Sequence, residues 1–337
     1  MLGRNLRLFG PRIDVQNCFR ERFGRSWFGA LKSLGESDWL MNTQSRDAKD
    51  LAHDVVLASI IVPVFNEAES VSQLRDRLMP IAQTLSADGV VEVIVVDDGS
   101  TDGTSTLVRK ELSDSGNISI RLLCHTENRG VGAAIATGFA NANGEIVCVI
   151  DSDCSYNPEE LPNVIDLLKS SGADIATASP YHPEGAVEGC PAWRIALSKL
   201  ASVAYSYVTP TRLHCYTSIF RVYRKEWARP EFITKMGFVG VTEHLLTAMR
   251  AGAQVVEYPT TLYARVYGVS KMRTVRVAMS HLGLIARTFV DRRSGKALLG
   301  SDSIGKSLSN ANTDSCNFEE ALTAIDSAID SADVERT

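Results

Sequence analysis

No apolar run in this sequence approaches the roughly 18 residues that a membrane-spanning helix requires. The N-terminus also lacks the continuous apolar core of a signal peptide. The chain has seven cysteines, an odd number, and no Cys-x-x-Cys pair, so neither a disulfide framework nor a structural zinc site is expected. These absences predict a cytoplasmic protein whose contact with a membrane, on its cytoplasmic face, would be peripheral.

Neither sign of charge is in large excess, because the 337 residues carry a formal net charge of only −5. The charge is uneven: residues 1–40 hold seven basic and four acidic side chains, whereas residues 297–337 hold two basic and eight acidic ones. The nearly neutral middle of the chain argues against nucleic acid as a partner. Hydrophobic residues make up 45% of the chain, which suffices for a full core and excludes global disorder.

The middle of the chain alternates between strand-like and helix-like patterns. Short β-branched runs alternate with amphipathic stretches, which predicts right-handed βαβ crossovers and a mostly parallel sheet. Strands are expected at 57–64, 91–96, 118–124, 145–150, 173–178, 217–223, 254–258 and 262–266. Helices are expected at 67–86, 103–115, 130–141, 159–171, 193–207 and 239–251.

Composition divides the chain into four parts. Residues 1–54 form an N-terminal extension that is basic over residues 1–40, and residues 55–270 carry the patterns of one catalytic domain. Residues 271–296 resemble a basic amphipathic helix that can lie in a membrane interface, although packing on the domain explains its apolar face equally well. Residues 297–337 are rich in Ser, Asp, Asn and Ala and are expected to be disordered. The apolar face of the helix consists of Met272, Val275, Met279, Leu282 and Phe289.

A first acidic turn, Asp97-Asp98, closes the apolar run at residues 91–96. Two adjacent carboxylates at a strand end repel each other, so a ribose hydroxyl, a base N–H or a cation is expected to compensate them. The simpler alternative is a turn followed by a helix N-cap, because Asp, Ser and Thr all cap helices well. Since ligands of open α/β sheets bind beyond the carboxyl ends of the strands, the position favours a binding role.

A second acidic turn, Asp151-Ser152-Asp153, closes the apolar run at residues 145–150. Mg²⁺ typically binds one or two carboxylates together with substrate phosphate, and the metal then neutralises a leaving nucleoside diphosphate. A lone Asp-x-Asp triplet is a weak signal, but this one follows an apolar strand and has a second acidic turn before it. The two turns together predict a metal-assisted site for a nucleotide sugar.

Four motifs give the chain a resemblance to a known family. The runs VPVFNE, VVDDGSTDGT, ENRGVGAAIATGF and DSDCSYNPEEL resemble those of family 2 glycosyltransferases over about residues 57–290, and most of all the dolichol- or polyprenyl-phosphate mannosyltransferase branch. The resemblance implies a GT-A fold, a Rossmann-like three-layer α/β/α sandwich with a mixed, mostly parallel sheet. It also implies inverting transfer of a hexose from a nucleotide sugar, with GDP-mannose preferred and UDP-glucose open.

The resemblance assigns roles to residues of both turns. It implies that Mg²⁺ or Mn²⁺ lies between the donor diphosphate and Asp151 and Asp153, with Ser152 beside them and Ser155 as a poorer third ligand. Arg129 is a candidate contact to the diphosphate or to the sheet end, although close helix–sheet packing is the simpler explanation of the glycines that follow it. The nucleoside would be surrounded by Pro63, Phe65, Glu67, Asp97 and Asp98.

Basic residues in the last third of the domain are candidates for binding an anionic acceptor. Arg194 follows a Gly- and Pro-containing loop at 180–192 and can fork onto a lipid phosphate; a surface loop with a buried Trp193 is the alternative. Arg265 and Lys271 resemble the family's closing signature and would meet the donor diphosphate and the acceptor phosphate. The acceptor implied by the resemblance is a polyprenyl or dolichyl phosphate.

Another acceptor class stays open. A sugar hydroxyl loses its proton during attack and needs a general base, for which Glu243 and His244 are the candidates in this sequence. Many hydroxyl-glycosylating members of the family carry a Glu-Asp pair at this place, and the Asp is missing here. A lipid phosphate is already an anion and needs cations instead. The remaining alternative is a non-catalytic domain that binds a nucleotide sugar without turnover.

Overall fold

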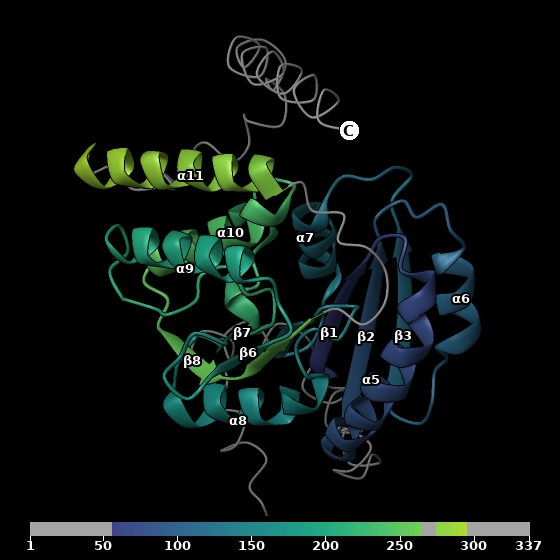
Figure 1. Ribbon diagram of the computed structural model, residues 1–337. Helices are drawn as coiled ribbons and strands as arrows, with labels where there is room; N and C mark the ends of the chain where they lie inside the picture. The colour runs from purple at the N-terminus through teal and green to yellow at the C-terminus, as the bar shows by residue number, and fades with distance from the viewer. Residues whose placement is uncertain (1–55, 265–273, 295–337) are drawn as a thin grey trace, which may run out of the picture.

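The computed structural model describes residues 56–264 and 274–294 (Figure 1). Within the second range, side chains are described for residues 279–290. The expected N-terminal extension and acidic tail lie outside the described residues. The same holds for Arg265 and Lys271, so their expected roles stay predictions.

Seven strands form one sheet in the order β3-β2-β1-β4-β7-β5-β8. All neighbours in it are parallel except β7, which runs antiparallel between β4 and β5. The predicted mixed, mostly parallel sheet is therefore confirmed. The strands are β1 (Val56–Val64), β2 (Val90–Asp97), β3 (Ile118–Cys124), β4 (Ile146–Val149), β5 (Ile175–Ser179), β7 (Arg221–Arg224) and β8 (Val255–Pro259). A second, two-stranded sheet pairs β6 (Ala186–Glu188) with β9 (Thr261–Tyr263).

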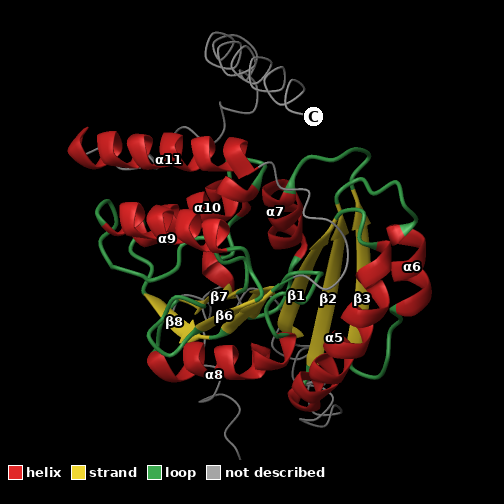
Figure 2. Cartoon of the chain, in the orientation of Figure 1, coloured by secondary structure: helices red, strands yellow, loops and turns green. Residues whose placement is uncertain are grey.

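Helices cover both faces of the large sheet (Figure 2). One apolar core joins α5, α6 and α8 to one face, and a second core joins α7, α9, α10 and α11 to the other. Along β1, Ile60 and Val62 belong to the first core and Ile61 to the second, because successive side chains of a strand point to opposite faces. The helices are α5 (Val71–Leu85), α6 (Thr104–Glu111), α7 (Val131–Asn141), α8 (Leu161–Ser171), α9 (Ala192–Ser206), α10 (Phe238–Arg250) and α11 (Thr274–Ser294).

The strand predicted at 217–223 begins only at Arg221. Of the residues before it, Phe220 still accepts the N–H of Ala178 in β5 at 3.0 Å, whereas residues 214–216 bond to side chains. The backbone N–H groups of His214 and Cys215 donate to the carboxylate of Glu257, and the N–H of Tyr216 donates to the hydroxyl of Ser202. These bonds anchor residues 214–216 in a loop that leads to the carboxyl edge of the parallel strands, where β7 starts beside the end of β4.

The helix predicted at 271–296 is present as α11 over Thr274–Ser294. His281, Leu284 and Thr288 are buried, while four large apolar side chains on the same helix are exposed. No helix in the described part of the chain has both the length and the apolar composition of a membrane span. The exposed side chains are Met279, Leu282, Phe289 and Val290.

Candidate active site

The two acidic turns lie at one edge of the sheet. β1 is parallel to both β2 and β4, with Val64 opposite Asp97 and Ile61 opposite Val149. The chain therefore leaves β1, β2 and β4 in the same direction, and the residues that follow each strand meet at the carboxyl edge, where ligands of such sheets bind. The structure thus brings the residues after Val64, the Asp97-Asp98 turn and the turn at 151–153 to this edge.

The carboxylate of Asp98 is buried and organises the start of α7. It accepts hydrogen bonds from the backbone N–H groups of Arg129 at 3.0 Å and Gly130 at 2.6 Å. Its Oδ1 also lies 2.6 Å from Nδ1 of His125, whose Nε2 lies 2.9 Å from the hydroxyl of Thr137. Asp98 therefore fixes the backbone of Arg129, and so the position from which that side chain projects.

The carboxylate of Asp97 is buried and also bonded within the chain. It accepts the backbone N–H of Ser100 at 2.8 Å, and the hydroxyl of Ser105 donates to its other oxygen. The chain itself therefore supplies hydrogen bonds to the carboxylates of both Asp97 and Asp98. A binding role for either carboxylate stays a prediction.

The loop after β1 is tied to the turn after β2. The N–H of Asn66 donates to the hydroxyl of Ser100 at 2.7 Å, and the side-chain oxygen of Asn66 accepts the N–H of Thr101 at 2.7 Å. Asn66 adopts a left-handed backbone with φ 50°, a conformation that Asn tolerates better than most residues. Phe65 and Glu67, the neighbours of Asn66, therefore lie on a rigid rim of the sheet edge.

The other expected nucleoside contact, Pro63, is less accessible. It lies within β1, opposite Val96 of β2, and is buried. Its contribution to a nucleoside site would be to shape the strand end and not to offer a free surface.

The second acidic turn has a constrained backbone. Asp153 is buried, and its Oδ1 accepts the N–H of Ser155 at 2.9 Å. Between them, Cys154 has a left-handed backbone with φ 53°, which costs about 1–2 kcal/mol for a non-glycine residue and persists where the surroundings enforce it. Ser155, expected to be a weak metal ligand, acts here through its backbone, because its carbonyl also accepts the N–H of Tyr263 at 2.9 Å.

The carboxylates of Asp151 and Asp153 suit a metal ion whose remaining ligands come from the substrate. Among the residues that the structure describes, no group of three or more His, Cys, Asp and Glu side chains is arranged to hold a metal by itself. Asp151 is half-buried and Asp153 is buried at the sheet edge. Mg²⁺ is commonly bound by one or two carboxylates, water and substrate phosphates, so Asp151 and Asp153 suit a cation that arrives with a diphosphate.

The β6–β9 ribbon joins this turn to the loop after β5. β9 pairs in parallel with β6, and Leu262 of β9 forms a bridge with Tyr156, three residues beyond Asp153. The N–H of Ala264 donates to the carbonyl of Glu188 at 2.8 Å. Arg265 follows Ala264 directly in the sequence, so the predicted closing signature starts from an anchored strand.

Arg194 lies in the first turn of α9. Its buried Nε has no hydrogen-bond partner among the described residues, and the centre of its guanidinium lies 5.4 Å from the ring centroid of Trp193. Trp193 is 51% exposed, so the alternative of a surface loop with a buried Trp is wrong. A partly buried guanidinium with an unused donor is suited to binding an anion such as phosphate.

A His–Glu pair in this region was missed by the sequence analysis. Nδ1 of His214 lies 2.7 Å from Oε2 of Glu257, and the rings of His214 and His182 have centroids 5.4 Å apart. The carboxylate also accepts the backbone N–H groups of His214 and Cys215 at 2.9 and 3.0 Å. No spacing in the sequence connects these residues, because they come from three separate segments that meet only in the folded chain.

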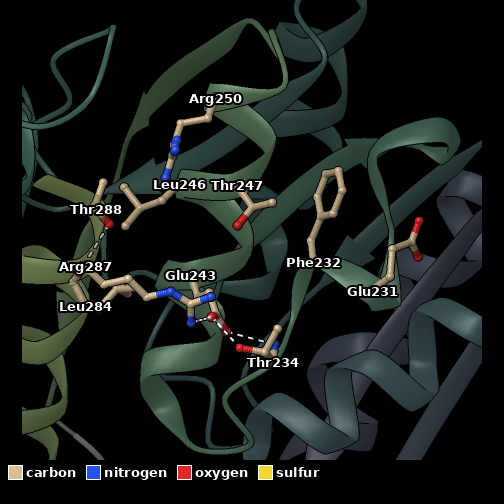
Figure 3. A pocket seen from close by; sticks show the side chains of 10 residues that line it. All are labelled: Glu231, Phe232, Thr234, Glu243, Leu246, Thr247, Arg250, Leu284, Arg287 and Thr288. Carbon is tan, nitrogen blue, oxygen red and sulfur yellow. Dashed lines mark hydrogen bonds and ion pairs between the residues drawn. The ribbon is translucent and has the colours of Figure 1, made fainter. Parts of the chain in front are cut away.

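Glu243 is buried in α10 and bonded on both oxygens. It accepts the N–H groups of Thr234 and Lys235, each at 2.8 Å, and the hydroxyl of Thr234 at 2.6 Å. Figure 3 shows this carboxylate pointing toward Thr234 and Arg287 in a pocket of about 130 Å³ between α10 and α11. The carboxylate therefore holds the loop before α10 and is not presented as a free base.

His244 is also buried, among three aromatic rings, with centroid distances of 5.0 to 5.6 Å. Burial lowers the pKa of His244 to about 3, so the imidazole is neutral at physiological pH. A side chain enclosed in this way cannot reach an acceptor hydroxyl without a rearrangement of the core. The rings are those of Phe139, Tyr223 and Phe232.

Comparison with known proteins gives matches in sequence. The family model described as Glycosyl transferase family 2 matches residues 59–231. Polyprenol monophosphomannose synthase of Mycolicibacterium smegmatis is 32% identical over 228 residues, which cover 65% of this chain and 83% of that protein. Dolichol-phosphate mannosyltransferase of Pyrococcus furiosus is 31% identical over 217 residues, or 64% of this chain. The match spans 59% of the length of that archaeal relative.

The fold also matches a solved structure. Glucosyl-3-phosphoglycerate synthase from Mycobacterium tuberculosis, in complex with Mn²⁺, UDP-glucose and phosphoglyceric acid, aligns with a TM-score of 0.51 at 19% sequence identity. The alignment covers 72% of this chain and 82% of that one. At this identity the similarity establishes a shared fold and carries no information on the substrate.

Proposed function

Because the chain belongs to glycosyl transferase family 2 and has the GT-A fold, we propose that it transfers a hexose from a nucleotide sugar to a polyprenyl or dolichyl phosphate. The expected family, fold and enzyme class are confirmed: the protein is a glycosyltransferase of the hexosyltransferase kind. The donor, the acceptor and the metal ion are the proposed part. Mannose from GDP-mannose is the preferred donor, because both named relatives are mannose transferases.

One observation carries the proposal: the acidic turn and Arg194, whose Nε has no hydrogen-bond partner among the described residues, lie on two segments that the β6–β9 pair connects. β9 contacts the turn that holds Asp153, and its partner β6 leads directly into the segment at which Arg194 starts α9. The acidic turn suits a cation bound to the donor diphosphate, and Arg194 suits an anionic acceptor. The acidic turn would thus hold a cation, and the start of α9 would bind an anion.

On the donor side, Asp151 and Asp153 would hold Mg²⁺ or Mn²⁺ against the diphosphate. When bound, the cation would neutralise the charge that develops on the leaving nucleoside diphosphate. Phe65 and Glu67 on the rigid rim after β1 would line the nucleoside. Arg129, whose backbone is fixed by Asp98, would supply a further positive charge at the sheet edge.

On the acceptor side, a phosphate oxygen would attack the anomeric carbon from the face opposite the diphosphate. The new carbon–oxygen bond would form as the bond to the diphosphate breaks, and the electron pair would leave with the diphosphate, which inverts the anomeric carbon. The attacking phosphate is an anion and needs no general base. Arg194, together with Arg265 and Lys271 in the segment outside the described residues, would reduce the repulsion between acceptor and donor.

A sugar-hydroxyl acceptor is less well supported. It requires a general base, and Glu243 is engaged by Thr234 and Lys235 while His244 is enclosed in the core. A non-catalytic binding domain would bind the donor without turnover. Hydrolysis or transfer of the donor in the presence of Mn²⁺ separates this last possibility from both enzymes.

The test compares two reactions of purified protein supplied with Mn²⁺ and labelled donor. The wild type is expected to label a short polyprenyl phosphate in detergent and to hydrolyse the donor slowly without acceptor. Replacing Arg194 by Gln should reduce kcat/KM for the acceptor by about 100-fold, since a charge-assisted contact to phosphate is lost, and leave donor hydrolysis unchanged. Lys169→Gln on the exposed surface of α8 removes a positive charge far from the site and serves as the control.

Unchanged acceptor kinetics in Arg194→Gln would contradict the assignment of this residue to the acceptor phosphate. Donor hydrolysis without any lipid product in the wild type would shift the proposal to a hydroxyl acceptor. No turnover of either donor would favour the binding domain.

A further inference from the structure

The outward face of α9 is apolar. At 100° per residue, five large side chains on α9 and its C-cap fall within an arc of about 120° on the helix surface. The opposite side carries Arg194 and Ser198 and, further along, the buried Ser202 and Tyr205. This is the reverse of the usual surface helix, whose exposed face is polar. The five side chains are Trp193, Leu197, Leu200, Val203 and Tyr207, which are 40 to 69% exposed.

α11 repeats the arrangement beside α9. Its exposed apolar side chains, Met279, Leu282, Phe289 and Val290, occupy an arc of about 100°, opposite three buried residues. The two helices touch, because the hydroxyl of Tyr205 lies 2.8 Å from Nδ1 of His281. Figure 1 shows α11 as a further layer over α9 and α10, and Leu284 of α11 joins the apolar core on that face of the sheet. These nine side chains are called the α9–α11 surface below.

The α9–α11 surface is where exposed apolar side chains concentrate. It contains nine of the twelve large hydrophobic side chains that are exposed in the described part of the chain. Large contiguous apolar patches are uncommon on soluble monomers and mark a site of contact with another molecule or a membrane. The surface therefore requires an occupant that can bury it.

Charge around the surface selects the kind of occupant. α9 contains Arg194 and Lys199 and no acidic residue, and residues 271–296 contain seven Lys or Arg and one acidic residue, Asp291. Among the described residues, Lys199 of α9 and Arg287 of α11 are exposed, and a second copy of the chain docked by the usual two-fold symmetry would bring such like charges together. An anionic lipid surface is complementary both to the apolar arcs and to the exposed Lys199 and Arg287 on the same two helices.

We propose that the α9–α11 surface docks on an anionic lipid bilayer and seats its apolar side chains at the boundary between head groups and acyl chains. Trp193 and Tyr207 at the two ends of α9 have the ring chemistry that favours this boundary. The purpose of the docking rests on the proposed function: it would hold the start of α9, where Arg194 follows Trp193, at the layer in which a polyprenyl phosphate carries its charge.

The test measures binding of the full 337-residue chain to vesicles by co-sedimentation. The wild type is expected to bind vesicles of phosphatidylcholine with phosphatidylglycerol, and to bind less to phosphatidylcholine alone or at high salt. The double variant Leu200→Glu and Leu282→Glu should lower the partition coefficient at least about tenfold, because two exposed apolar contacts become charges. Both positions are exposed, so folding should be unaffected, which circular dichroism checks.

The matched control adds the same two charges to the opposite side of the sheet. Gln83→Glu on α5 and Ser170→Glu on α8 are exposed positions far from α9 and α11, and this double variant should bind vesicles like the wild type. Transfer to a short polyprenyl phosphate in detergent is measured in parallel. The Leu200→Glu and Leu282→Glu variant should keep this reaction while losing transfer to acceptor embedded in vesicles.

The outcomes separate the docking surface from the proposed function. Vesicle binding by the wild type without lipid glycosylation in any setting would refute the proposed acceptor and leave the surface supported. Equal vesicle binding by the two double variants would overturn the surface. A wild type that ignores vesicles but forms dimers, which the Leu200→Glu and Leu282→Glu variant dissociates, would also overturn it and assign the surface to a second copy.

Discussion

The carboxylate of Asp98 accepts the backbone N–H of Gly130 at 2.6 Å and so links the end of β2 to the start of α7. Gly130 has φ 96°, and a Cβ added there would lie 2.5 Å from the carbonyl oxygen of Met236. The N–H of Ala133 donates to the same carbonyl at 3.2 Å. Three segments, the first acidic turn, the start of α7 and the loop before α10, therefore meet around one glycine.

Replacing Gly130 by Ala should destabilise the fold strongly, because it combines backbone strain with a collision against a carbonyl. We expect the free energy of unfolding in urea to fall by about 2 kcal/mol more than in Gly252→Ala. Gly252 is the control because it has a similar φ of 104° and no heavy atom of the described residues within 4 Å of the added Cβ. Equal losses of unfolding free energy in the two variants would show that the close approach to Met236 does not affect stability.

Glu243→Gln separates a structural carboxylate from a general base. Gln can accept only through its amide oxygen, so one of the three bonds to Thr234 and Lys235 is lost and stability should fall by about 1–3 kcal/mol. Transfer to polyprenyl phosphate at a temperature well below unfolding should change less than about tenfold. A general base would instead account for about 100- to 10,000-fold in kcat, and a loss of that size with unchanged stability would contradict a purely structural role of Glu243.

The buried His244 should make stability depend on pH. Burial lowers the pKa of this imidazole to about 3, so the unfolded chain, with an ordinary pKa near 6.5, binds a proton that the folded chain does not. The contribution of His244 to the free energy of unfolding is present in full above the pKa of the unfolded chain. It is lost as the pH falls toward the pKa of the folded chain. Lowering the pH from 7 to 5 should therefore lower the free energy of unfolding by about 2 kcal/mol.

Urea unfolding at the two pH values measures this slope, and His244→Phe, which keeps an aromatic ring in the core, should reduce it by that amount. His281, whose pKa burial lowers to about 4, contributes in the same direction and is left intact in the variant. The same pH slope in wild type and variant would show that His244 is not held neutral by the core.

The sheet and its functional edge can be predicted from the sequence, because a buried strand is visible there as a continuous apolar run. The apolar runs before Asp97 and Asp151 contain few polar residues since both faces of these central strands are covered by helices. A turn after such a run must lie at the carboxyl edge of a parallel sheet. The position of both acidic turns could thus be predicted, together with the order of helices and strands up to residue 179.

The acceptor side could not be predicted to the same depth. The contact of His214 with Glu257 joins residues 43 positions apart and exists only once β8 has paired with β5. The exposure of Trp193 contradicts the general tendency of aromatic side chains toward burial, and the spacing of apolar residues along α9 does not reveal which face turns inward. Bonds within the chain to Asp97 and Asp98 likewise depend on loops that meet only in the fold.

Transfer of labelled hexose to a polyprenyl phosphate is the reaction that the proposed donor and acceptor sites together should catalyse. Purified protein is incubated with labelled GDP-mannose or UDP-glucose, Mn²⁺ and a short polyprenyl phosphate in detergent, with Asp153→Ala and a chelator as controls. We expect a labelled lipid that mild acid cleaves and that is absent in both controls. Hydrolysis of a donor that depends on the metal ion, without any labelled lipid, would contradict the proposed transfer.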